Sequence, residues 1–125
     1  FISANPFVQI AGITALQKAI PEAKLMNKIY TERRKLALEG LESIGLETNP
    51  YPDGAFYALF NVSDFEKDSM KLASEILIST GVALAPGKDF GPKGEGHLRL
   101  SYCNSKENIE EGINLIGKFL KEKYL

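Results

Sequence analysis

One short segment, residues 97–103, constrains the fold most, because polar and apolar side chains alternate along it. A period of two is typical of a β-strand that buries one face. The alternation sorts the segment into an apolar face, with Leu98, Leu100 and Tyr102, and a second face, with His97, Arg99, Ser101 and Cys103. We expect the leucine face to pack on helices and the arginine face to look outward, toward a cleft or a partner domain.

Arg99 lies in the middle of this segment, among apolar neighbours. A guanidinium in such a place is costly to desolvate unless an anion meets it. One interpretation is a fork that grips the carboxylate of a small ligand through two parallel hydrogen bonds, which a lysine cannot do. The other is a structural ion pair with one of the sixteen acidic residues of the chain. The residues alone leave both interpretations open.

Capping and turn residues divide the rest of the chain. Asn5 is placed to cap a first helix, and Ser105 a last one, while Gly45 and Gly81 follow apparent helix ends. The expected helices are 5–19, 22–43, 70–80 and 106–123, and the expected strands are 46–48, 56–62, 82–85 and 97–103. Few, short strands in this order predict a single α+β domain over residues 1–125, in which a small antiparallel or mixed sheet of three to four strands is covered by helices.

The composition excludes several classes of function. The fifteen basic and sixteen acidic residues nearly cancel and form no basic block, so no nucleic-acid or membrane partner is expected. One histidine and one cysteine cannot build an ordinary structural zinc site. We expect His97 to be a polar residue at the rim of a site and Cys103 to be a small core residue. A single cysteine also fits a reducing compartment, which predicts a cytoplasmic protein.

Three motifs, read together, point to a known family. They are Pro-Asp-Gly-Ala-Phe-Tyr at 52–57, Gly-Val-Ala-Leu-Ala-Pro-Gly-Lys-Asp-Phe-Gly at 81–91, and Gly-Glu-Gly-His-Leu-Arg-Leu-Ser-Tyr at 94–102. With the lead-in at 5–16, their order resembles the C-terminal part of the class I and II aminotransferases, the fold-type I enzymes related to aspartate aminotransferase that use pyridoxal 5'-phosphate. The resemblance covers essentially the whole chain.

The resemblance implies roles for particular residues. In that family the arginine at the Arg99 position binds the α-carboxylate of the amino-acid substrate, and the aromatic residue at the Phe56 position lines the substrate side. The lysine that forms a Schiff base with the cofactor lies upstream in the family, so Lys88 is not that lysine and no catalytic residue is expected here. The aspartate at the pyridine nitrogen and most phosphate contacts also lie upstream. Pyridoxal 5'-phosphate is therefore expected in the full-length enzyme, but not bound to this segment alone.

These expectations extend to partners. Because the sequence begins at Phe1 without methionine, we expect it to be the C-terminal segment of a longer aminotransferase, inactive alone, with aspartate as the expected amino donor. The first helix and part of the second should then expose apolar surface that a missing N-terminal large domain covers, and the isolated piece should form a homo-oligomer. Two alternatives remain: a free-standing, non-enzymatic α+β module that holds a small carboxylate through Arg99, and an interaction domain in which Arg99 is only an ion-pair residue.

Overall fold

The computed structural model describes residues 3–48 and 51–125, which contain four α-helices and a three-stranded antiparallel sheet. The α+β class and the small sheet are thus as the sequence predicted. The chain forms two compact units, Phe1–Thr31 and Glu32–Leu125. The single-domain expectation for residues 1–125 stays a prediction.

The first unit holds helix α1 (Pro6–Lys18) and the beginning of helix α2 (Ile20–Ser43). Asn5 caps α1 as predicted, because its side-chain oxygen accepts a hydrogen bond of 2.9 Å from the backbone N–H of Phe7. Large apolar side chains of this unit are exposed, namely Phe7, Val8, Ile10, Ile13, Leu16, Ile20, Leu25, Met26 and Ile29. A helix that is apolar on most sides is ordinarily buried, so α1 carries a surface suited to a covering partner.

The sheet of the second unit consists of β1 (Tyr57–Asn61), β2 (Ala85–Pro86) and β3 (His97–Ser101), in the order β1-β3-β2. Both pairings are antiparallel, and β3 is the central strand. Arg99 of β3 lies opposite Leu59 of β1 on one side and opposite Ala85 of β2 on the other. Residues directly opposite share a face of the sheet, so these three side chains stand on the same side.

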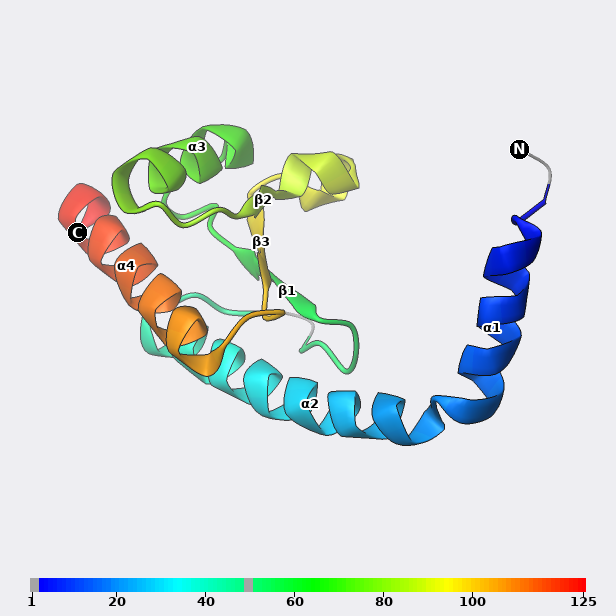
Figure 1. The fold of residues 1–125 in the computed structure, drawn as a ribbon. Helices are drawn as coiled ribbons and strands as arrows, with labels where there is room; N and C mark the ends of the chain where they lie inside the picture. Colours follow the sequence, from blue (N-terminus) through cyan, green and yellow to red (C-terminus); the bar gives the residue numbers. More distant parts are fainter. Residues whose placement is uncertain (1–2, 49–50) are drawn as a thin grey trace. The chain divides into compact units, whose positions relative to one another are not determined.

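The other face of the sheet forms the core. Leu98, Leu100 and Tyr102 are buried, which confirms the predicted leucine face. The C-terminal part of α2, helix α3 (Ser69–Thr80) and helix α4 (Lys106–Tyr124) gather on that side of the sheet (Figure 1). Their buried apolar residues are Ala37, Leu38 and Leu41 in α2, Leu72, Ala73 and Ile76 in α3, and Ile109, Ile113, Ile116 and Leu120 in α4.

Two predicted strands differ from the structure. Residues 46–48 form no strand, although Leu46 is buried and the Glu47 carbonyl accepts a bond of 3.2 Å from the Asn61 N–H. The strand expected at 82–85 is instead Ala85–Pro86. Gly81 ends α3 in the left-handed conformation, and the Val82 N–H bonds the Thr80 hydroxyl, so the chain turns before it pairs. The sequence also predicts a turn-rich loop at 49–54, of which Asn49 and Pro50 lie outside the described residues.

The connection from β2 to β3 contains two 3₁₀ helices, η1 (Gly87–Phe90) and η2 (Pro92–Gly94). Its two ends pass very close to each other. A Cβ atom added to Gly87 would lie 1.8 Å from the Gly94 carbonyl oxygen and 2.6 Å from the His97 carbonyl oxygen. Only glycine allows this approach, which fixes the path of the loop over the edge of the sheet.

We therefore expect Gly87→Ala to destabilise the chain by about 1–3 kcal/mol, because rigid backbone atoms must move apart. The measurement is the free energy of unfolding in urea. Gly54→Ala is the matched control, since a Cβ at Gly54 would meet nothing within 4 Å. Equal stability of the two variants would contradict the tight crossing of the loop.

Candidate functional site

Arg99 stands on the open face of the sheet, in the middle of its central strand, and is half-buried. Two aromatic rings hold its guanidinium. The central carbon of the guanidinium lies 5.1 Å from the centroid of the Tyr57 ring and 4.8 Å from the centroid of the Phe90 ring. Both distances are within the range of cation–π attraction.

The guanidinium has no carboxylate partner in the part of the chain that the structure describes. Its Nε atom is buried and without a hydrogen-bond partner among those residues. A buried polar group without a hydrogen-bond partner costs free energy, so its presence calls for an explanation. The structural ion-pair interpretation of Arg99 thus finds no support here, and the site retains unused capacity to bind an anion.

The surroundings of Arg99 follow from the pairing of the strands. Tyr57, Leu59, Asn61, His97 and Ser101 alternate with the buried core residues and are exposed or half-buried. His97 is half-buried, and its Nδ1 lies 3.1 Å from the Glu95 carbonyl oxygen. It therefore sits at the margin of this face, as a rim residue would.

Phe56 precedes β1, and its side chain is about half exposed, at 49%. Its ring meets the Tyr57 ring edge to face, with centroids 5.4 Å apart and an interplanar angle of 89°. Phe56 thus braces one of the two rings that flank Arg99. The role predicted for Phe56 at a substrate stays a prediction.

The turn that carries these aromatic residues is tied to the end of β3. The Phe56 carbonyl accepts a bond of 2.8 Å from the Tyr102 N–H, and the Tyr102 hydroxyl donates to the carbonyls of Gly54 and Ala55, at 3.2 and 3.3 Å. Burial raises the pKa of the Tyr102 hydroxyl, so it remains a donor at neutral pH. Ala55 has a φ of 63°, a strained value for a non-glycine residue that these contacts hold in place.

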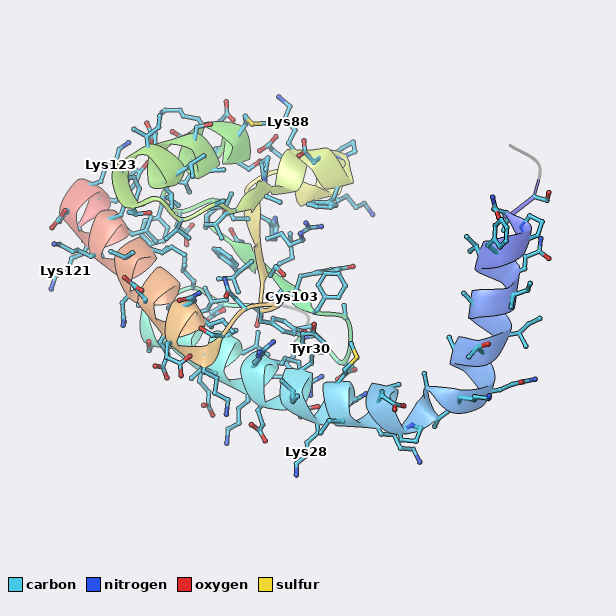
Figure 2. The ribbon with its side chains drawn as sticks, viewed as in Figure 1. Lys28, Tyr30, Lys88, Cys103, Lys121 and Lys123 are labelled. Carbon is cyan, nitrogen blue, oxygen red and sulfur yellow. The ribbon has the colours of Figure 1, made fainter. Side chains whose placement is uncertain are left out.

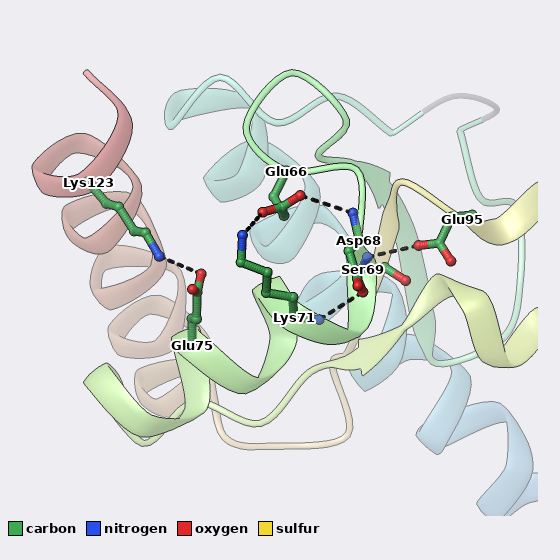
Figure 3. A network of polar contacts seen from close by, with 7 residues as sticks. All are labelled: Glu66, Asp68, Ser69, Lys71, Glu75, Glu95 and Lys123. Atoms are coloured by element: carbon green, nitrogen blue, oxygen red, sulfur yellow. Dashed lines mark hydrogen bonds and ion pairs between the residues drawn. The ribbon is translucent and has the colours of Figure 1, made fainter.

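A polar network around the buried side chain of Ser69 supports the loop that carries Phe90 (Figure 3). The Lys88 N–H donates to the Ser69 hydroxyl at 3.2 Å, and the Ser69 N–H donates to the Glu95 carboxylate at 2.8 Å. Hydrogen bonds from the Ser69 N–H, from its hydroxyl and from the Gly96 N–H hold the pKa of Glu95 below its usual value of 4.5. Glu95 thereby links the first turn of α3 to the end of the loop.

The described residues do not fit a complete site for pyridoxal 5'-phosphate. Lys88 is exposed and its side chain points outward (Figure 2), and the Arg99 guanidinium is in contact with two rings. An imine-forming lysine and an acid for the pyridine nitrogen, the groups that orient and tune this cofactor, do not converge on the arginine face. No group of three or more histidine, cysteine, aspartate or glutamate side chains suited to a metal occurs in the described parts.

Cys103 was expected in the core, and this is wrong, because Cys103 is exposed (Figure 2). The alternation along 97–103 puts Cys103 on the face of Arg99, and its exposure agrees with that face and not with the general tendency of free cysteines to be buried. Cys103 lies in the connection to α4, and its N–H bonds the Ser101 hydroxyl at 3.3 Å.

Three functional or supporting residues received no individual role from the sequence, although the resemblance implies that the loop at 86–90 lies near the pocket entrance. Tyr57 could have been found from its place on the same strand face as Leu59, but Phe90 meets Arg99 only through the fold of the loop. Arg34 of α2 reaches the Pro52 carbonyl at 3.2 Å and so anchors the segment before β1.

A cavity of about 450 Å³ lies near the start of α4 and is lined in part by Val82, Leu100, Asn104 and Asn108. Neither Arg99 nor Phe56 lines it. Ser101 and Cys103, which share the strand face of Arg99, do line it, so the cavity borders the end of that face but does not include the guanidinium.

The comparisons with known proteins agree with this geometry. The model of the family "Aminotransferase class I and II" matches residues 1–116. The chain is 41% identical over 121 residues to an aspartate aminotransferase of Pyrococcus horikoshii, covering 92% of this chain and 30% of that protein. It is 40% identical over 114 residues to a valine–pyruvate aminotransferase of Mycobacterium tuberculosis, covering 90% and 29%.

The solved structures give the same result. A crystal structure of an aminotransferase from Mycobacterium tuberculosis matches with a TM-score of 0.83 at 40% identity and covers 91% of this chain and 30% of that one. The chain thus spans about 30% of the length of these relatives. As for membranes, no described helix is both long and apolar enough to cross a bilayer.

The lowered pKa of Glu95 predicts a pH-dependent contribution to stability. Because the pKa is lower in the folded state, the contribution is complete above pH 4.5 and is lost as the pH falls through the folded value. We expect Glu95→Gln to be less stable than wild type at pH 7, with the difference shrinking below pH 4.5. Urea unfolding across this range measures it, with Glu110→Gln on the exposed face of α4 as the control. A difference that does not change with pH would contradict the role of the charge.

Proposed function

Because the chain belongs to the class I and II aminotransferase family, we propose that it is the C-terminal, substrate-binding domain of a longer pyridoxal-phosphate-dependent aminotransferase. The reaction would move an amino group between an amino acid and a 2-oxo acid. The observation that carries the proposal is Arg99, a guanidinium on an open sheet face, with no acidic partner among the described residues and with one nitrogen unsatisfied.

In this proposal Arg99 binds the α-carboxylate of the substrate and Phe56 lines the substrate side. A planar fork that donates two parallel hydrogen bonds fixes the orientation of a carboxylate as well as its position. Holding the acid group in one orientation restricts which face of the α-carbon meets the reactive groups, and such positioning lowers the barrier of the reaction.

The reactive groups themselves would come from outside this chain. The arginine face lacks the lysine and acid that pyridoxal 5'-phosphate needs, and the chain spans about 30% of the length of its relatives. We propose that an N-terminal large domain supplies the cofactor site, and that this chain alone neither binds the cofactor nor catalyses the reaction.

Aspartate is the amino donor that we propose. The resemblance to an aspartate aminotransferase of Pyrococcus horikoshii supports it, at 41% identity. The valine–pyruvate aminotransferase of Mycobacterium tuberculosis matches nearly as well, at 40%, so identity over this region does not by itself distinguish between amino donors.

The competing proposal is a free-standing module that binds a small carboxylate without catalysis. Such a module needs a largely enclosed site, because small-molecule sites bury most of their ligand. The rings beside Arg99 are instead substantially exposed, Tyr57 at 40% and Phe90 at 50%. An open face is better explained by a second domain that completes the pocket. We also propose a cytoplasmic location, based on the single cysteine and the family.

The role of Arg99 is tested in the full-length enzyme. We expect Arg99→Ala to lower kcat/KM for the amino acid at least about 100-fold, because two charge-assisted hydrogen bonds are lost. Arg99→Lys keeps the charge but not the fork, so it should remain at least about 10-fold below wild type. Lys93→Ala, at an exposed cation of η2, is the control. An unchanged kcat/KM in Arg99→Ala would exclude this residue from the site.

The apolar surface of the first unit predicts self-association of the isolated chain. Exposed Ile13 and Leu16 should be covered by a second copy when no large domain is present. We expect light scattering to show dimers or larger species at high concentration, and Ile13→Lys with Leu16→Lys to shift them toward monomer. Gln17→Lys adds a charge to the same helix without removing an apolar side chain and is the control. A wild-type chain that stays monomeric would refute this prediction.

A further inference from the structure

The two rings beside Arg99 offer the guanidinium an attraction that uses none of its N–H donors. Tyr57 stands on β1 two residues before Leu59, the residue opposite Arg99, so it is a diagonal neighbour on the same face. Phe90 comes from η1, beyond the other side of the central strand. Diagonal neighbours across strands are within reach of aromatic and long side chains. The guanidinium thus meets a ring contributed from each side of its strand.

We propose that Tyr57 and Phe90 are positioning residues that hold the Arg99 guanidinium by their ring faces and leave its N–H donors free for the carboxylate of an amino acid. This inference rests on the proposed function and goes beyond it, because it assigns a task to two residues that make no hydrogen bond to Arg99. We call the pair of rings the aromatic clamp.

The aromatic clamp can orient the guanidinium without neutralising its charge. Holding the side chain with a carboxylate of the protein would orient it, but would also occupy its donors and cancel its charge before a ligand arrives. A ring face attracts the cation through its quadrupole and restricts the plane of the guanidinium while the charge remains uncompensated. A planar, delocalised cation suits such stacking better than an ammonium does. The buried, unpartnered Nε fits this arrangement, since ring faces give it no acceptor.

Each ring is itself fixed by the fold. The Phe56 ring meets the Tyr57 ring edge to face, and the Phe56 carbonyl is bonded to the Tyr102 N–H. On the other side, the Lys88 N–H bonds the buried Ser69 hydroxyl, two residues before Phe90. The close crossing of Gly87 and Gly94 completes this support. Contacts within the chain therefore hold the segments that carry both rings.

The first test concerns kinetics in the full-length enzyme. We expect Tyr57→Leu and Phe90→Leu each to raise KM for the amino acid by roughly threefold to thirtyfold, with a smaller change in kcat, because Arg99 keeps its charge but loses its orientation. The conservative variants Tyr57→Phe and Phe90→Tyr keep a ring and should remain near wild type. A loss caused only by the missing volume would instead appear in stability and in kcat alike.

The second test does not depend on activity. Nuclear magnetic resonance of the arginine side chains in the same protein should show the Arg99 Nε–H proton shifted by the two rings. The leucine variants should lose this shift, and the conservative variants should retain it. Titration with succinate, an unreactive carboxylate, should give weaker binding in the leucine variants by the same factor as the rise in KM.

The outcomes separate the two proposals. If Arg99→Ala raises KM while both leucine variants leave KM and succinate binding unchanged, the clamp is overturned and the proposed function stands. If Arg99→Ala leaves kcat/KM unchanged, the proposed function fails, and the clamp fails with it. A ring-current shift that persists in the leucine variants also overturns the clamp, whatever the kinetics.

Discussion

The register of the central strand is the constraint on which the rest of the structure depends. Leu98 and Leu100 enter the core between the helices, and Arg99 between them must then face the other way. A slip of one residue in the pairing would exchange the two faces. It would bury the guanidinium among apolar side chains, which is costly for a charge without a partner. The same register therefore buries the leucines and places the arginine on the other face.

The helices and this register were accessible from the sequence because both depend on local signals. Asn5, Asp68 and Ser105 each cap a helix through a side-chain hydrogen bond, and Gly81 ends α3 in the conformation that favours glycine. These interactions join residues only a few positions apart. Capping chemistry and the period of two therefore sufficed to place them.

The errors concern segments whose structure depends on distant partners. Pairing of β2 with β3 is short because Pro86 cannot donate a ladder hydrogen bond and the loop turns sharply into η1 after it. Residues 46–48 are β-like in composition, yet they lie beside the sheet with one bond to Asn61. Cys103 is a separate case: it was placed in the core because free cysteines are often buried, although the alternation already put it on the arginine face, and it is exposed. The sequence marks the preference for strand but not where pairing stops.

The candidate site divides in the same way. Arg99 could be identified from its own strand, because its immediate neighbours in the sequence are apolar and make desolvation of the guanidinium costly. Phe90 could not, because its ring reaches the guanidinium only after η1 has crossed Gly94 and bonded Ser69. The two rings orient the guanidinium but leave its charge uncompensated. Nothing within the described second unit encloses this face, as expected for a site shared between two parts of a protein. On this chain, the rings of Tyr57 and Phe90 must attract the guanidinium strongly enough to orient it. They must also leave its charge and its N–H donors available to the ligand.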